Sequence, residues 1–355
     1  GVAATRSKVL TVPAVDAGLA KVVEPEITDL GPRPKPNTAE IVPFAIAMRY
    51  QTQQMVVWWL DRMAASDHGL TEKMTWFWHG HWATSVDKLN YPLPMFKQNK
   101  TMRATCLGNF ATMTKAMIND GALQFWLDGQ DNTSKAPNEN LGRELMELFT
   151  LGVGRYTEDD VKNISRVLTG YQVNRSNGTV TINQNRRDKN PVNLLGTTAV
   201  FTGDTLADFL VARDDSAKFI SERLWYRFVS STEDMPASFT AKNAFASRDI
   251  SAAVAAMAND SAMRDEKYAM VKSPVEWLIS ACRALELTPS QLKTPNQLIN
   301  YLDKLGQVPF SPPNVGGWPA GEAWLSSATA QYRIAFATWL IKQSDLRALK
   351  EIKPA

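Results

Sequence analysis

Apolar residues recur at helical spacing along most of this chain. Within 38–66, the predicted apolar face carries Ala45, Met48, Met55, Trp59 and Met63, while polar side chains lie off that face. Comparable patterns return in the stretches 70–85, 100–119, 138–152, 157–170, 206–211, 216–229, 237–246, 250–257, 274–285, 294–302 and 327–349. The pattern predicts an all-α fold, a large multi-helix domain.

Two kinds of interruption are expected in this helical domain. Residues 171–173 and 179–182 flank a turn sequence, Arg175-Ser-Asn-Gly178, and predict one small β-hairpin within an excursion of about 171–200. Long Pro/Gly-rich loops are expected at 31–37 and 306–323. We therefore expect a weakly structured N-terminal segment over 1–37 and a single helical domain over 38–355.

Composition excludes several classes of protein. The net charge is only +3 and no run of Lys and Arg forms a basic patch, so we expect no nucleic-acid partner. The longest apolar runs fall far short of the ~20 residues of a membrane span, so no transmembrane segment is expected. Cys106 and Cys282 lie in apolar helical patterns and are interpreted as buried, inert thiols.

The stretch 74–85 (MTWFWHGHWATS) contains two of the three histidines and three of the eleven tryptophans. At about 100° per residue, His79 and His81 point roughly 200° apart on a helix. A regular helix cannot aim both at one point. Either one of them is functional, or the helix unwinds near Gly80, the residue that permits a bend.

The stretch 138–152 (NENLGRELMELFTLG) is the expected counterpart, with Asn138 as N-cap. Glu144 and Glu147 share one helical face, and Arg143 lies beside it. The simplest interpretation is a solvent-exposed face with a Glu139–Arg143 pair, or a buried network that only holds helices together. The alternative is a functional polar centre.

Four stretches in order resemble the domain of unknown function 1800 family of bacteria. They are FWHGHWATS (77–85), APNENLGRELMELFTLGVGRYTEDDV (136–161), KSPVE (272–276) and PPNVGGWPAGEAWL (312–325). The resemblance implies a mainly helical fold and an extracytoplasmic location, secreted or periplasmic. It implies no reaction, because the family has no established biochemical role.

The chain departs from this family at two places. Members usually open with a segment like HLLxRxxFG, and this sequence begins at the glycine of that motif. The family's HDxGxKxxLG segment aligns with 187–196, where Arg187, Asn190 and Val192 replace the histidine, the inner glycine and the lysine. If those residues belong to a shared polar centre, this chain carries an altered version of it.

One functional hypothesis is a metal-dependent hydrolase or oxidoreductase. Imidazole and carboxylate ligands suit a divalent transition metal, with room for an activated water. The candidate metal ligands are His79, His81, Glu144, Glu147 and Asp188.

A second version of the enzyme hypothesis needs no metal. Burial would raise the pKa of Glu144, which then acts as a general acid or base with a histidine partner. The candidate catalytic residues are His81, Arg143, Glu144 and Glu147, and the 306–323 loop is expected to cover this centre.

The alternative is a non-catalytic extracellular binding or assembly module. Its tryptophan-rich loops would stack on a glycan or anchor a protein partner. The candidate partner-binding residues are Asn138, Asn314, Trp318 and Trp324, although each tryptophan could equally be a core residue. An exported enzyme is the slightly preferred expectation.

Overall fold

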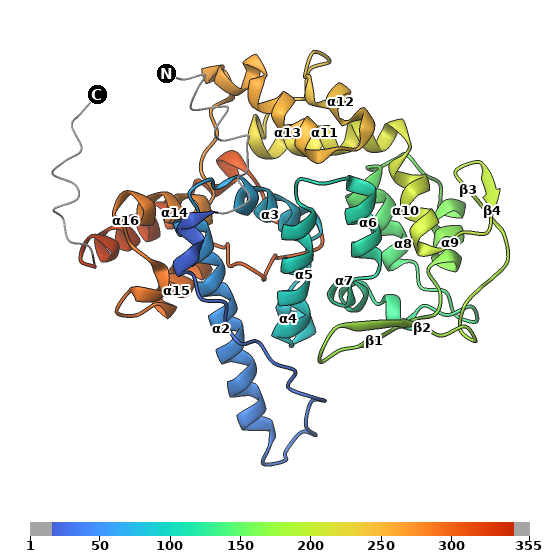
Figure 1. The fold of residues 1–355 in the computed structure, drawn as a ribbon, viewed down its shortest axis with the longest axis horizontal. Helices are drawn as coiled ribbons and strands as arrows, with labels where there is room; N and C mark the ends of the chain where they lie inside the picture. Colours follow the sequence, from blue (N-terminus) through green and yellow to red (C-terminus); the bar gives the residue numbers. More distant parts are fainter. Residues whose placement is uncertain (1–15, 344–355) are drawn as a thin grey trace.

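Helices make up most of the protein, as expected from the apolar spacing (Figure 1). The computed structural model describes residues 16–343. The helices central to the argument are α2 (Ile41–Ala65), α3 (Leu70–His81), α11 (Asp214–Phe228) and α14 (Pro274–Ala284). The others are α4 (Val86–Leu89), α5 (Pro92–Thr105), α6 (Phe110–Ile118), α7 (Gly121–Trp126), α8 (Asn140–Glu144), α9 (Glu158–Val167), α10 (Gly203–Val211), α12 (Ala241–Ala244), α13 (Ile250–Asn259), α15 (Asn296–Lys304) and α16 (Ser327–Ile341).

The predicted hairpin is present, and a second one follows it. Strands β1 (Tyr171–Asn174) and β2 (Thr179–Ile182) pair antiparallel. Strands β3 (Val192–Leu194) and β4 (Thr197–Ala199) form another short antiparallel pair in the stretch expected to be loop. Its two-residue turn has positive φ angles at Leu195 and Gly196, the geometry of tight hairpins. Because Leu-Gly is not a typical turn sequence for this geometry, the hairpin was not predicted.

The two ends of the chain are described only in part. Within 16–37, the regular structure is one short 3-10 helix, Ala17–Lys21. Residues 1–15 of the predicted weakly structured segment lie outside the described residues. The last predicted helix, 327–349, corresponds to α16, which ends at Ile341, and residues 344–355 again lie outside the described part.

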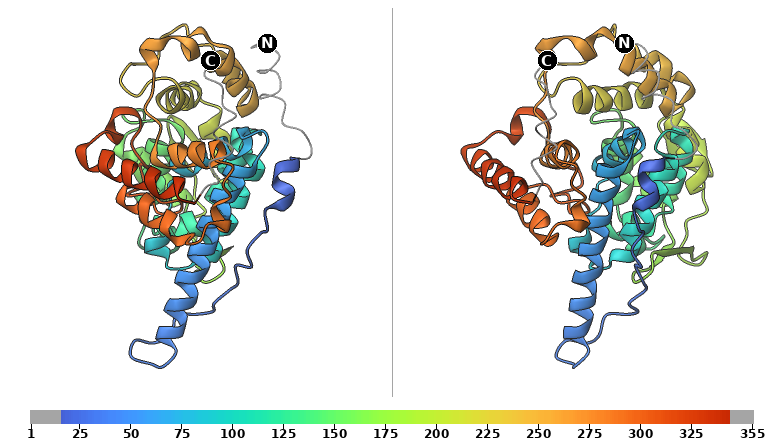
Figure 2. Two further views of the ribbon diagram at one scale, coloured as in Figure 1. Left: turned by 90° about the vertical axis from the view of Figure 1, so that its left-hand side faces the viewer. Right: turned by 60° about the vertical axis from the view of Figure 1, so that its left-hand side comes forward.

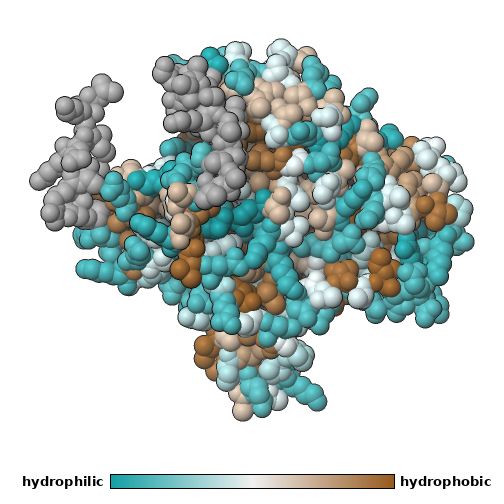
Figure 3. Space-filling model, in the orientation of Figure 1, coloured by the Kyte–Doolittle hydropathy of each residue, from teal (hydrophilic) through white to brown (hydrophobic). Residues whose placement is uncertain are grey.

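Helix α2 is the longest element and extends beyond the rest of the molecule at its N-terminal end. This projection is visible in both views of Figure 2. Val42, Ile46 and Tyr50 recur every four residues there and are more than half exposed. The projecting end accordingly shows hydrophobic patches in Figure 3. The C-terminal half of α2 is buried and carries Trp58 and Trp59.

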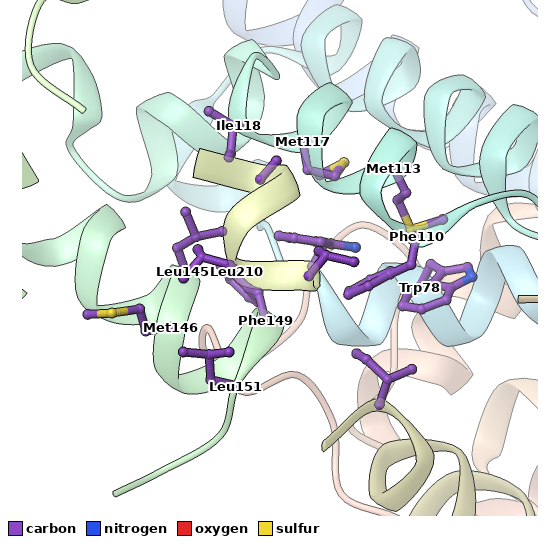
Figure 4. Close-up of a cluster of buried hydrophobic side chains, with 14 of the residues drawn as sticks. Trp78, Phe110, Met113, Met117, Ile118, Leu145, Met146, Phe149, Leu151 and Leu210 are labelled. Carbon is purple, nitrogen blue, oxygen red and sulfur yellow. The ribbon is translucent and has the colours of Figure 1, made fainter. Parts of the chain in front are cut away.

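Two hydrophobic clusters form the interior, and α3 contributes to both. The first cluster contains Trp78, Phe110 and Phe149, packed between α3, α6 and the segment after α8 (Figure 4). The second contains Trp59 and Phe310, with Trp76 packed against it. Helix α3 therefore has two apolar sides, and its histidines lie among the aromatic residues of both.

Cys106 and Cys282 are free and buried, as predicted, and burial raises the pKa of their thiols to about 11 and about 12. Among the described helices, none combines the length and apolar character that crossing a bilayer requires.

Candidate functional site

His79 is a completely buried residue that binds a distant backbone group. Its Nε2 accepts a hydrogen bond from the N–H of Phe310 at 3.0 Å. The ring packs among Trp59, Trp76, Phe310 and Trp318. Burial in this aromatic environment lowers the pKa of His79 to about 3, so the imidazole is neutral at physiological pH.

His81 lies on the opposite side of α3, in the first hydrophobic cluster. Its Nε2 donates to the carbonyl oxygen of Phe149 at 2.9 Å. That carbonyl belongs to the last turn of a helix, where backbone acceptors lack intrahelical partners. Burial, and then the charges of Arg223 and Arg227, lower the pKa of His81 to about 3.

Helix α3 stays regular through Gly80, so it does not aim both histidines at one point. Of the two alternatives, the unwound helix is wrong. The helix is also shorter than predicted, because it ends at His81 rather than Ser85, and its N-cap is Gly69 rather than Thr71. Each histidine joins α3 to a different part of the chain.

The five candidate metal ligands are not brought together. Asp188 is in an ion pair with Arg166 at 2.7 Å, while Glu147 accepts from the hydroxyl of Tyr156. Within residues 16–343, no group of three or more His, Cys, Asp or Glu side chains has the arrangement to hold a metal ion. The donor set expected from the sequence therefore does not fit a metal.

The predicted helix 138–152 is divided into two kinds of helix. Helix α8 continues directly as a π-helix, Leu145–Thr150. The hydroxyl of Thr150 donates to the carbonyl of Leu145 at 2.6 Å within this wider turn. The π-turn changes the register, so Glu147 and Leu151 no longer follow α-helical spacing from Asn140.

Arg143 takes part in the ion pair that the simplest interpretation predicted. It binds Glu139 at 3.2 Å and Glu158 at 2.7 Å. The side chain of Glu144, next to it, makes no ion pair or hydrogen bond in the described structure. Burial, and then the charge of Glu147, raise the pKa of Glu144.

The four candidate partner-binding residues have two structural roles. Asn138 and Asn314 cap local turns, since their Oδ1 atoms accept from the N–H of Asn140 at 3.0 Å and of Gly316 at 2.9 Å. Trp318 and Trp324 are each only 4% exposed. They are thus wall residues rather than exposed stacking platforms.

A cleft of about 490 Å³ lies between α3, the end of α11, the segment before α14, and α14 itself. A narrower part of it continues under the 306–323 loop, where Trp318 and Trp324 line it. We call both parts together the central cleft. The residues common to both parts are Lys73, Trp76, Arg227, Phe228, Met270, Val271 and Glu276. Three of the four family-like stretches thus border one cavity: 77–85, 272–276 and 312–325.

The charged side chains that line both parts of the central cleft are of two kinds. Lys73 and Glu276 form an ion pair, and although burial opposes it, the charge of Lys73 lowers the pKa of Glu276. Arg227 makes no ion pair in the described structure and instead donates to the carbonyl oxygens of Trp318 and Pro319. Of these three charged side chains, Arg227 is therefore the one without an ion-pair partner in the described structure.

The 306–323 loop is shaped by close backbone packing on α3. Gly317 has a φ of +77°, and a Cβ atom there would overlap the carbonyl oxygen of Gly80. His79 fixes one end of the loop through Phe310, and Arg227 fixes the other through Trp318. The loop does act as a cover, but over the central cleft rather than over a His/Glu/Arg centre.

Sequence reasoning missed the charged residues of this cleft. Glu276 ends the KSPVE stretch and could have been chosen on that ground. Lys73 carries no motif signal, and its pairing with Glu276 spans 203 residues of chain. Arg227 lies in an ordinary amphipathic helix, where nothing distinguishes it from a solvent-exposed cation.

Comparison with known proteins places nearly the whole chain in one family. A search of curated proteins and a search of solved structures returned no match. The sequence model of the family described as "Protein of unknown function (DUF1800)" matches residues 13–353, nearly the full length. The chain belongs to the DUF1800 family.

Proposed function

We propose that the protein is an exported binding module that takes a ligand with an apolar, aliphatic body into the central cleft. The observation that carries the proposal is the cleft itself. Its wider part is lined by flexible or branched apolar side chains of Met63, Met263, Met270, Val275 and Ile279. Methionine-rich walls adapt to ligands of varied shape, and concave apolar surface is the usual form of a small-molecule site.

This composition favours an aliphatic ligand over a glycan. Sugar rings stack on exposed aromatic faces, but the Trp318 indole is already stacked on Trp76 at 5.1 Å. Trp324 is buried as well. A hydrocarbon body, by contrast, gains free energy by displacing water from the apolar walls, at roughly 25 cal/mol per Å² of buried area.

A catalytic function finds less support at the cleft. Glu276, a carboxylate lining both parts, is in an ion pair with Lys73, and its pKa is lowered rather than tuned toward neutrality. A second candidate function, acid–base chemistry, is supported by one observation only: the raised pKa of Glu144 beside Glu147. That pair lies outside the cleft.

An extracytoplasmic location is part of the proposal and is supported by the resemblance to exported family members. The test is fractionation of the native host with an antibody against the protein. Recovery with the periplasmic or secreted fraction is expected, and recovery with the cytosolic fraction would contradict this part of the proposal.

Calorimetric titration with decanol tests the binding function. Decanol is expected to bind the wild-type protein, and Ile279→Trp, which fills the cleft, is expected to abolish binding. Ile334→Trp is the matched control, because Ile334 is 69% exposed on α16 and lies outside the cleft. Absence of decanol binding to wild type, or equal binding by the Ile279→Trp variant, would overturn the proposal.

A further inference from the structure

Two arginines follow one another along the same face of α11. Arg223 and Arg227 are separated by four residues, one helical turn, and both are half-buried. Arg227 lines the central cleft. The two guanidinium groups are close enough that, after burial, the charge of Arg223 lowers the pKa of Arg227 to about 10.

Neither arginine forms an ion pair in the described structure, although the charge of Glu276 acts on Arg227 from a greater distance. Glu222, the neighbouring acid on α11, interacts with Arg155 at 3.6 Å and Lys218 at 3.7 Å. Glu276 is paired with Lys73. The side chain of Arg223 makes no hydrogen bond in the described structure, and its Nε atom is fully buried without a partner. Its one polar interaction is with the face of the Tyr226 ring, 5.7 Å away.

The surroundings of the pair are aromatic. Phe219, one turn before Arg223, packs near His81 with ring centroids 6.1 Å apart, and Phe228 packs on Phe77 at 5.5 Å. His81 is neutral in this environment because its pKa is about 3. Partial burial of two adjacent cations in such surroundings costs free energy, and a bound anion would offset this cost.

We infer that Arg227, which lines the central cleft, and Arg223, one helical turn before it on α11, together form an oxyanion subsite at one end of the cleft. The ligand class is a carboxylate or phosphate attached to an apolar body. Guanidinium groups bind such oxyanions through two parallel N–H···O bonds, and the unpartnered Nε of Arg223 supplies a free donor. This inference rests on the proposed binding function and specifies the head group of the ligand.

The subsite is tested by comparing decanoate with decanol in calorimetric titrations. The two probes share an apolar chain and differ in the head group. Decanoate is expected to bind about tenfold more tightly than decanol, or better, given the usual strength of charge-assisted hydrogen bonds. Arg223→Gln is expected to abolish this preference and leave decanol binding unchanged. Arg49→Gln, on the exposed part of α2, is the matched control.

Two further measurements separate this inference from a structural role of the arginines. Without ligand, Arg223→Gln is expected to raise the melting temperature, because it removes an uncompensated charge. Inorganic phosphate is expected to stabilise the wild type against heat and not the variant, and to compete with decanoate. Loss of stability in Arg223→Gln, without any change in decanoate preference, would overturn the inference.

The remaining outcomes distinguish the two proposals. If decanol binds in the cleft but decanoate binds no more tightly, the binding function stands and the oxyanion subsite is wrong. If decanol does not bind while phosphate stabilises wild type and not Arg223→Gln, the anion site is real and the apolar ligand is wrong. If neither probe nor phosphate has an effect, both proposals are wrong.

Discussion

The ring nitrogen Nε2 of His79 and the backbone N–H of Phe310 are 3.0 Å apart although 231 residues separate them in the chain. Phe310 has a positive φ of 68°, an unusual conformation for a bulky residue. The hydrogen bond and the surrounding aromatic rings therefore fix the position at which the covering loop leaves the second hydrophobic cluster. Loop position and cleft shape both depend on this contact.

The substitution His79→Ala is expected to reduce the free energy of unfolding by about 2–4 kcal/mol. It leaves the buried N–H of Phe310 without an acceptor and creates a cavity among aromatic rings. His68→Ala, in the turn before α3, is the control and should change stability by less than about 0.5 kcal/mol. Urea denaturation of both variants measures the difference, and equal losses would contradict a specific role for His79.

A methyl group at Gly317 is expected to displace the covering loop. Gly317→Ala adds a clash with the carbonyl of Gly80 to the strain of a positive φ. Gly154 has nearly the same φ, 76°, with open space around its Cα, so Gly154→Ala isolates the strain of about 1 kcal/mol. Thermal melts should show a clearly larger loss for Gly317→Ala. Similar losses of melting temperature in the two variants would show that the loop shifts at little cost and that its contact with Gly80 does not fix its position.

Acidification is expected to destabilise the protein through its buried histidines. Burial lowers the pKa of His79 and His81 from about 6.5 to about 3, so between these pH values the unfolded chain binds more protons than the folded one. The free energy of unfolding therefore falls as the pH decreases through this window. The slope is at most about 1.4 kcal/mol per pH unit for each histidine. Melting temperatures from pH 7 to pH 4 measure it.

The titration of Asp120 has the opposite effect on the free energy of unfolding and must be distinguished from that of the histidines. Burial raises the pKa of Asp120 to about 6, so its folded form retains a proton between its ordinary pKa and pH 6, and its contribution grows as the pH falls. Asp120 contributes equally to wild type and His81→Gln, so the difference between their pH profiles of stability isolates the contribution of His81. A variant with an unchanged slope would show that His81 does not contribute.

The fold was predictable because helical spacing is a local property of sequence. The long apolar pattern at 38–66 corresponds to α2, and the hairpin β1–β2 was visible as two short strands around a Gly-containing turn. The π-helix after Glu144 could not be predicted from the sequence, because its wider turn depends on tertiary contacts such as the hydrogen bond from His81 to the carbonyl of Phe149.

The site was less predictable because its residues come from distant parts of the chain. The motif-bearing helix and loop were recognised, but His79 and His81 were assigned to one centre although a regular helix separates them. Residues two positions apart on a regular helix point in roughly opposite directions, so the spacing of the two histidines already argued against one shared centre. Lys73, Arg227 and Glu276 become neighbours only through packing of α3, α11 and α14, which no local pattern encodes.

The ion pair of Lys73 and Glu276 is expected to contribute modestly to stability and to control the charge of the cleft. Lys73→Met removes the partner of a half-buried carboxylate, and a loss of about 1 kcal/mol is expected, because the side chains remain 42% and 28% exposed. Adding Glu276→Gln should recover part of this loss. Lys100→Met, whose pair with Glu24 is more exposed, is the control. Additive effects in the double variant would exclude coupling.

The carboxylates of the 138–152 stretch provide the sharpest test between the cleft and the centre expected from sequence. Burial and the charge of Glu147 raise the pKa of Glu144, so ionised Glu144 destabilises the folded state as the pH rises above its ordinary pKa. Glu144→Gln is expected to raise the free energy of unfolding at pH 7 by about 0.2–0.5 kcal/mol, the usual size of a like-charge term on a helix. Glu139→Gln should instead lower the free energy of unfolding slightly, because Glu139 binds Arg143.

Both variants should bind decanol as the wild type does, since neither residue lines the cleft. Destabilisation of the protein by Glu144→Gln, or weaker decanol binding, would contradict this expectation. It would show that the carboxylate pair and the central cleft are coupled, and it would favour Glu144 and Glu147 as the functional centre.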